Sequence, residues 1–163
     1  IMAGTLALDR GCRDDASTVL AARARIGVMA KVQRLLLDPE SAAAVSLKAV
    51  LRETAEDLLD LHETFREVDI RGPDSYVGTD VALLAALAAN EILMDFLDAD
   101  EKSALVFDLT SDGGIAIGLE GSRTCGLPEP SPAAHALAEQ GGGSITKNEH
   151  AVILTIGQGL LSG

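Results

Sequence analysis

The sequence has very few aromatic residues and few basic ones. It contains no tryptophan, three phenylalanines and one tyrosine in 163 residues, and 25 acidic residues against 13 lysines and arginines, for a formal net charge of −12. Nucleic acid binding needs basic patches and stacking rings, and anionic membranes attract basic segments. The composition therefore argues against nucleic acid, acidic partners and anionic membrane surfaces as ligands.

Cysteines and long apolar runs are also scarce. Cys12 and Cys125 lie far apart in the chain and lack the spacing of metal ligands, which favours reduced, unpaired thiols. No apolar run is long enough to span a bilayer, and no signal peptide is visible. These absences predict a cytoplasmic protein without a membrane segment.

What the chain does contain is enough aliphatic residue for a folded core. Hydrophobic residues make up 47% of the sequence, which argues against disorder. Because aromatic rings are rare, we expect a core of Leu, Ala, Val and Ile. A chain of 163 residues fits one domain, or one domain with a helical appendage.

Residues 1–40 have the pattern of a helical hairpin. Residues 1–8 look like the end of a helix whose beginning is missing, and residues 16–37 form a long helix that ends at Asp38-Pro39. The long helix has apolar positions at alternating spacings of three and four with one polar position among them: Val19, Ala22, Ile26, Met29, Gln33 and Leu36. Such a seam is typical of half of a dimeric four-helix bundle, but a hairpin that packs on its own domain fits equally well.

Residues 41–163 predict an α+β domain. Strand patterns cover 44–47, 65–70, 104–109, 115–120 and a closing hairpin in 144–156, and helical patterns cover 47–61, 79–97 and 133–140. Ser46 is a candidate helix cap, and the glycine-containing segment 111–114 is a strong hairpin signal. The order suggests an α/β sandwich, one mixed sheet with helices layered on one face.

The helix predicted at 79–97 is apolar until its last two turns. Polar side chains then come in quick succession, at Asn90, Glu91 and Asp95. Glu91 and Asp95 are four residues apart and so share a helical face. The segment is either a core helix that reaches the surface or one wall of a ligand site.

Five strings in this order resemble the dimerisation and ATP-binding core of bacterial histidine kinases, most closely the HWE type. IMAGTLAL (1–8) and ARARIGVMAKVQRLLLDPES (22–41) are similar to the two dimerisation helices. VSLKAVLRETAEDL (45–58) is similar to the start of the ATP-binding domain, LAANEILMDFL (87–97) to its asparagine box and HALAEQGGGSI (135–145) to its last helix. The resemblance implies a dimerisation hairpin in 1–40 and a GHKL-type ATPase domain in 41–163.

The resemblance also implies where Mg-ATP would bind. Asn90 and Glu91 match the opening pair of the box, Asp95 stands at the position of the metal-binding asparagine, and Gly126 is the glycine that remains of the adenine-binding Asp-x-Gly-x-Gly motif. Ser122 replaces the adenine-reading aspartate, and three prolines (128, 130 and 132) occupy the place of the glycine-rich lid. These departures predict a degraded ATP site and no resident cofactor. If ATP does bind, we expect it at Asn90, Glu91, Asp95 and Gly126, with Mg²⁺ at Asp95.

The histidines give no second catalytic pattern. In the family, the phosphoacceptor lies about two turns before the positions matching Ile1 and Met2, so we expect it upstream of Ile1. His62 beside Glu63 looks like an acceptor next to an acid, but it ends a helix of the domain rather than standing on the bundle. His135 and His150 are read as structural.

Three functions stay open. The first is a kinase-like histidine phosphotransferase or docking platform in two-component signalling, a homodimer whose partner is the receiver domain of a response regulator. The second is an active sensor histidine kinase with a divergent Mg-ATP site. The third is a scaffold whose cleft holds nothing.

Overall fold

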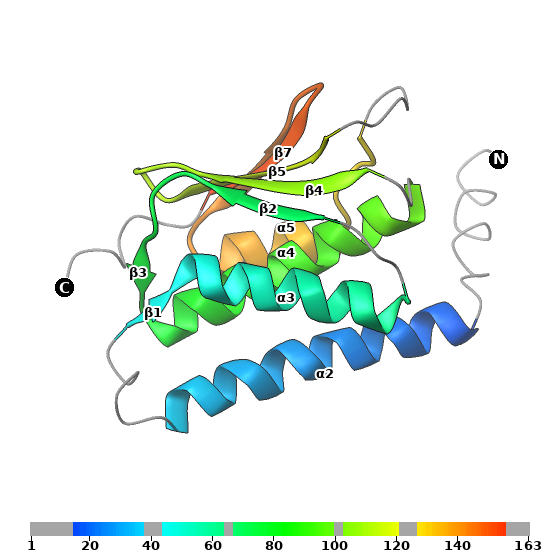
Figure 1. Ribbon diagram of the computed structural model, residues 1–163, viewed down its shortest axis with the longest axis horizontal. Coiled ribbons are helices and arrows are strands. Elements are labelled where there is room, and N and C mark those ends of the chain that lie inside the picture. The colour runs from blue at the N-terminus through cyan, green and yellow to red at the C-terminus, as the bar shows by residue number, and fades with distance from the viewer. Residues whose placement is uncertain (1–14, 38–43, 64–66, 100–102, 121–126, 156–163) are drawn as a thin grey trace, which may run out of the picture.

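Three layers make up the structure, a computed structural model that describes residues 15–37, 44–63, 67–99, 103–120 and 127–155. A twisted β-sheet covers one side of a layer of helices, and a long helix lies on the other side of that layer (Figure 1). The residues predicted as a first dimerisation helix, 1–8, lie outside the described residues, as do Cys12 and Cys125.

The elements follow the predicted order with one addition. The helices are α2 (Asp15–Leu37), α3 (Leu47–Leu61), α4 (Thr79–Ala99) and α5 (Pro132–Gln140), and the strands are β1 (Val45–Ser46), β2 (Val68–Arg71), β3 (Tyr76–Val77), β4 (Ala104–Leu109), β5 (Gly114–Glu120), β6 (Ser144–Lys147) and β7 (Ala151–Thr155). The strand β3 was not predicted. Its two residues are too few to give an alternating pattern, and they pair with β1 as a small antiparallel ribbon.

The main sheet has five strands in the order β2-β4-β5-β7-β6. β2 and β4 pair in parallel, because α4 forms the crossover between them, and the other neighbours are antiparallel. The hairpin between β4 and β5 turns where predicted, and Gly113 there has φ 85°, a left-handed conformation that suits glycine. The mixed sheet with helices on one face confirms the predicted α+β fold.

Helices α3 and α4 form the core against this sheet. α3 begins after Ser46, whose side chain accepts a hydrogen bond from the backbone N–H of Ala49 at 3.1 Å, as predicted for a cap. α4 is buried almost all round. The largest fully buried side chains are mostly aliphatic: Phe96, Phe107, Leu47, Leu51, Leu58, Ile92, Leu93, Leu105, Ile115, Ile117, Leu154 and Val81.

The helix α2 packs against α4 and α3 on the side away from the sheet (Figure 1). It uses Ala24 and Val28, which are buried, rather than the predicted seam. Three seam residues remain largely exposed, with Val19 at 58%, Ile26 at 65% and Met29 at 46%. α2 therefore has two faces, one bound to its own domain and one apolar face open to solvent. The division into a hairpin of 1–40 and a domain of 41–163 stays a prediction.

None of the helices in the described part of the chain combines the length and apolarity required to cross a bilayer.

Candidate functional site

The polar end of α4 carries three of the four residues expected at a nucleotide site. Asn90 and Glu91 are buried, at 1% and 7% exposure, and Asp95 is half-buried one turn further on. They occupy these positions because α4 is the crossover helix between β2 and β4 and is fixed on both faces. Gly126 and the matched motif of 122–126 lie outside the described residues.

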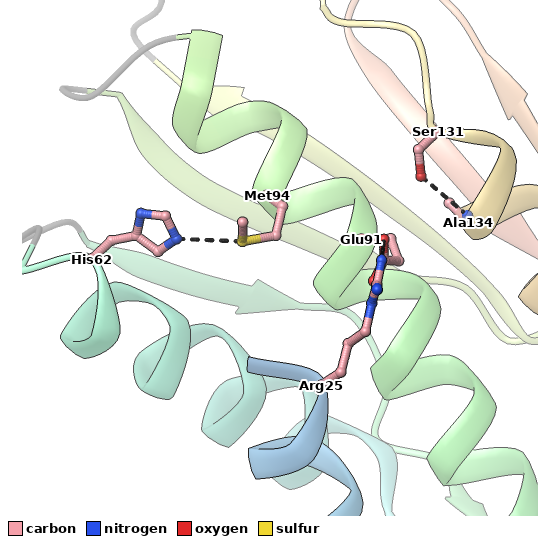
Figure 2. A network of polar contacts seen from close by, with 6 residues as sticks. All are labelled: Arg25, His62, Glu91, Met94, Ser131 and Ala134. Carbon is pink, nitrogen blue, oxygen red and sulfur yellow. Dashed lines mark hydrogen bonds and ion pairs between the residues drawn. The ribbon is translucent and has the colours of Figure 1, made fainter. Parts of the chain in front are cut away.

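Glu91 binds a basic residue of α2. Arg25 donates through Nε to Oε1 of Glu91 at 2.6 Å and through a terminal nitrogen to Oε2 at 2.7 Å, a bidentate ion pair. Figure 2 shows the Arg25 side chain reaching from α2 up to Glu91 on α4. The hydrogen bond to Glu91 raises the pKa of Arg25 above its ordinary value, although partial burial works in the other direction.

Asp95 lies beside the start of α5 instead. Its Oδ2 accepts a hydrogen bond from the backbone N–H of Ser131 at 3.2 Å. Ser131 in turn caps α5, because its hydroxyl accepts from the N–H of Ala134 at 3.2 Å (Figure 2). A carboxylate at a helix N-terminus is stabilised by the orphan N–H groups and the helix dipole.

Asn90 has a different environment from both acids. Its amide nitrogen is buried and has no hydrogen-bond partner among the described residues. A buried amide donor left unpaired costs about 1–3 kcal/mol. Asn90 lines a cavity between α2, α3 and α4.

The three residues therefore do not converge on one ligand. Glu91 is engaged by α2, Asp95 contacts the start of α5, and Asn90 faces a separate cavity. A hard cation prefers several oxygen ligands, and no group of three or more His, Cys, Asp or Glu side chains in the described part could hold a metal. Each of the three therefore has different surroundings in this structure, and Asp95 is the one that the resemblance implies for Mg²⁺.

The histidines occupy separate places. Nε2 of His62 lies 3.3 Å from Sδ of Met94 on α4 (Figure 2), and Glu63, after the end of α3, has φ 53°. His135 on α5 and His150 before β7 are exposed. These surroundings suit structural or surface histidines.

Sequence reasoning did not find Arg25 as a partner of this region. The two residues of the pair are 66 positions apart, and a single sequence carries no signal that links such distant charges. A second pair missed in the same way joins Lys31 of α2 to Asp57 of α3 at 2.6 Å. Both pairs depend on α2 packing against its own domain, which was only one of the two alternatives.

Comparisons with known proteins find structural relatives but no sequence relatives. No protein-family model and no curated protein matches the chain. The structure is similar to the blue-light activated histidine kinase of Erythrobacter litoralis, with a TM-score of 0.60 and 15% identity over 80% of this chain. The chain spans about half of that protein, 51% of its length.

Two separate domains match more completely. The histidine kinase domain of the same Erythrobacter protein gives a TM-score of 0.59 and 17% identity over 91% of this chain and 86% of its own length. The ATP binding domain of PrrB from Mycobacterium tuberculosis gives 0.55 and 17% identity over 71% of this chain and 96% of its own length. This chain therefore has the fold of the histidine kinase ATP-binding domain, as the three strings matched to that domain (45–58, 87–97 and 135–145) predicted.

Proposed function

We propose that this chain acts in two-component signalling as a kinase-like histidine phosphotransferase or regulator-docking platform, without using ATP itself. The observation that carries the proposal is the bidentate pair between Glu91 and Arg25. Glu91, which matches the opening pair of the family's asparagine box, is instead neutralised by Arg25 of the protein's own α2. An incoming Mg-ATP would have to break this pair.

Asp95 supports the same proposal. An asparagine at this position would bring no charge to the triphosphate, whereas the carboxylate adds one negative charge beside it. Oδ2 of Asp95 already accepts a hydrogen bond from the backbone N–H of Ser131. The prolines at 128 and 130 stiffen the segment just before α5, where a mobile lid would be needed, and Pro132 is the first residue of α5.

The open face of α2 would supply the contacts with partners. Val19, Ile26 and Met29 form an apolar strip that suits a second copy of the chain, and the strip is bordered by basic residues such as Arg34. A receiver domain of a response regulator would dock on the resulting bundle and bring its own Mg²⁺. A cytoplasmic location follows from this role.

Calorimetric titration with Mg²⁺ and a non-hydrolysable ATP analogue tests the proposal. We expect no saturable heat at micromolar concentrations. The double variant Arg25→Ala/Asp95→Asn removes both the competing cation and the extra charge, and we expect it to bind the analogue more tightly than the unmodified chain. Micromolar binding by the unmodified chain would overturn the proposal.

An active kinase with a divergent ATP site is the second candidate, since the fold is similar to the ATP binding domain of PrrB. Saturable binding of Mg-ATP that is lost in Asp95→Ala would identify this alternative.

A further inference from the structure

The helix α2 is attached to the rest of the domain through a narrow apolar face. Among the α2 side chains that the structure describes, only Ala24 and Val28 are buried, and both are small. The neighbouring helix α3, by contrast, buries seven of its 15 residues. Hydrophobic stabilisation scales with the apolar area removed from water, so this term holds α2 less firmly than it holds α3.

The contact between α2 and the domain is also incompletely packed. A groove with about 200 Å³ of space runs between α2, α3 and α4, and Gly27 of α2 lines it. A Cβ atom at Gly27 would meet no heavy atom within 4 Å. Atoms that border such a space lack the dispersion contacts of a close-packed core. Packing alone therefore holds α2 weakly.

Ion pairs provide the other contacts of α2. Arg25 binds both carboxylate oxygens of Glu91 on α4, at 2.6 and 2.7 Å. On α3, Nζ of Lys31 lies 2.6 Å from Asp57 and 3.7 Å from Glu53. α2 has four basic residues and one acidic residue in a chain with a net charge of −12. Attraction between opposite charges therefore favours the packing of α2, and salt weakens this attraction.

We propose that α2, Asp15–Leu37, is a releasable strap that separates from α3 and α4 as one unit while the rest of the domain stays folded. The ion pairs of Arg25 and Lys31 control this equilibrium. The main core lies on the other side of α3 and α4, against the sheet, so release leaves it intact (Figure 1). Release also removes the cation from Glu91 and uncovers its carboxylate. α2 thereby controls access to the candidate site, and this inference does not rest on the proposed function.

Native-state hydrogen exchange of the unmodified chain, followed by NMR at rising urea concentrations below the unfolding transition, tests the proposal. A released helix of 23 residues is only marginally stable in water, so its amides exchange once the strap opens. Release exposes little surface, and we expect exchange of α2 amides to change little with urea. Amides of α4 exchange through global unfolding and should accelerate steeply. If α2 amides accelerate in parallel with those of α4, the proposal is wrong.

Three variants test the role of the ion pairs. Arg25→Ala should speed exchange of α2 amides by about 5- to 100-fold, because the buried Glu91 loses its cation in the closed state only. Lys31→Ala should have a smaller effect, since its partners are about half exposed. Arg34→Ala, the matched control at an exposed position of α2, should change exchange by about twofold or less.

Salt gives an independent measurement of the same control. Potassium chloride at about 0.5 M should accelerate exchange of α2 amides in the unmodified chain, and the response should be smaller in Arg25→Ala/Lys31→Ala. Equal exchange rates in Arg25→Ala and Arg34→Ala would overturn the proposal, because the ion pairs would then not control release. No nucleotide or partner takes part in these experiments, so their failure is distinguishable from failure of the proposed function.

Discussion

Arg25 and Glu91 form a bidentate ion pair in which the two side chains are buried to very different extents. The Glu91 side chain is only 9% exposed, whereas that of Arg25 is 48% exposed. Removal of the arginine would therefore leave a buried carboxylate without its cation, and such an uncompensated charge is costly. The ion pair therefore stabilises the buried Glu91 carboxylate more than it stabilises the exposed Arg25 guanidinium.

We predict that Arg25→Ala destabilises the protein by about 1–3 kcal/mol, less than the loss of a fully buried pair because water partly screens Arg25. Urea unfolding measures this free energy. The matched control is Arg34→Ala, an exposed position on the same helix, which should change stability by no more than about 0.5 kcal/mol. Equal effects of the two variants would show that the ion pair contributes nothing.

Asp112, in the turn between β4 and β5, makes stability depend on pH. A hydrogen bond from the Thr110 hydroxyl, helped by backbone N–H groups, lowers the pKa of Asp112 below its ordinary value of 3.8. A lowered pKa in the folded state gives stability that is present above 3.8 and is lost as the pH falls through the folded value.

We therefore predict that the unmodified chain is more stable than Asp112→Asn at neutral pH and that the difference shrinks once the pH falls below 3.8. Thermal unfolding of both proteins across this range measures the difference. A gap that stays constant with pH would show that the Asp112 charge has no part in the turn.

At the scale of elements, α2 is the part whose surroundings were hardest to predict. Its length and its apolar seam follow from local periodicity, and residues 16–37 were predicted within one residue of the observed Asp15–Leu37. The side that faces the domain could not be predicted, because Ala24 and Val28 are too small and too few to form a pattern. The ion pairs that fix this side join residues far apart in sequence.

We predict that Ile26→Asp, at a position that is 65% exposed, prevents a second copy from packing on α2 and leaves the domain folded. Light scattering after size exclusion should show a dimer for the unmodified chain and a monomer for the variant. Ala49→Asp places the same charge at an exposed position of α3 and should leave the mass unchanged. If the unmodified chain and both variants are all monomers, the proposal that the chain forms a dimer is wrong.

The other elements were predicted where a short stretch carries its own signal. Ser46 as a cap and the glycine-containing turn after β4 depend on neighbouring residues alone. The candidate site was predicted as three residues of α4, Asn90, Glu91 and Asp95, together with Gly126, which lies outside the described residues. The directions in which these side chains point depend on tertiary packing. Glu91 binds Arg25 of α2, and Asp95 binds the backbone N–H of Ser131 at the start of α5.

At the scale of the whole molecule, stability depends on one core between the sheet and the helices. Phe107, in the middle of β4, is completely buried there. We predict that Phe107→Ala costs about 3–5 kcal/mol, since it removes a large apolar side chain and leaves a cavity. Tyr76, 68% exposed, is the matched aromatic control, and Tyr76→Ala should change the urea midpoint little. A small effect at Phe107 would mean that the core repacks around the loss.

The order of the sheet also constrains how the protein is made. β5 has β4 on one side and β7 on the other, and β7 ends at Thr155, late in the chain. Until β7 docks, the free edge of β5 has no strand to pair with, and an unpaired edge can pair with another chain. Pairing of β7 with β5 therefore closes an edge at which the partly folded chain could aggregate.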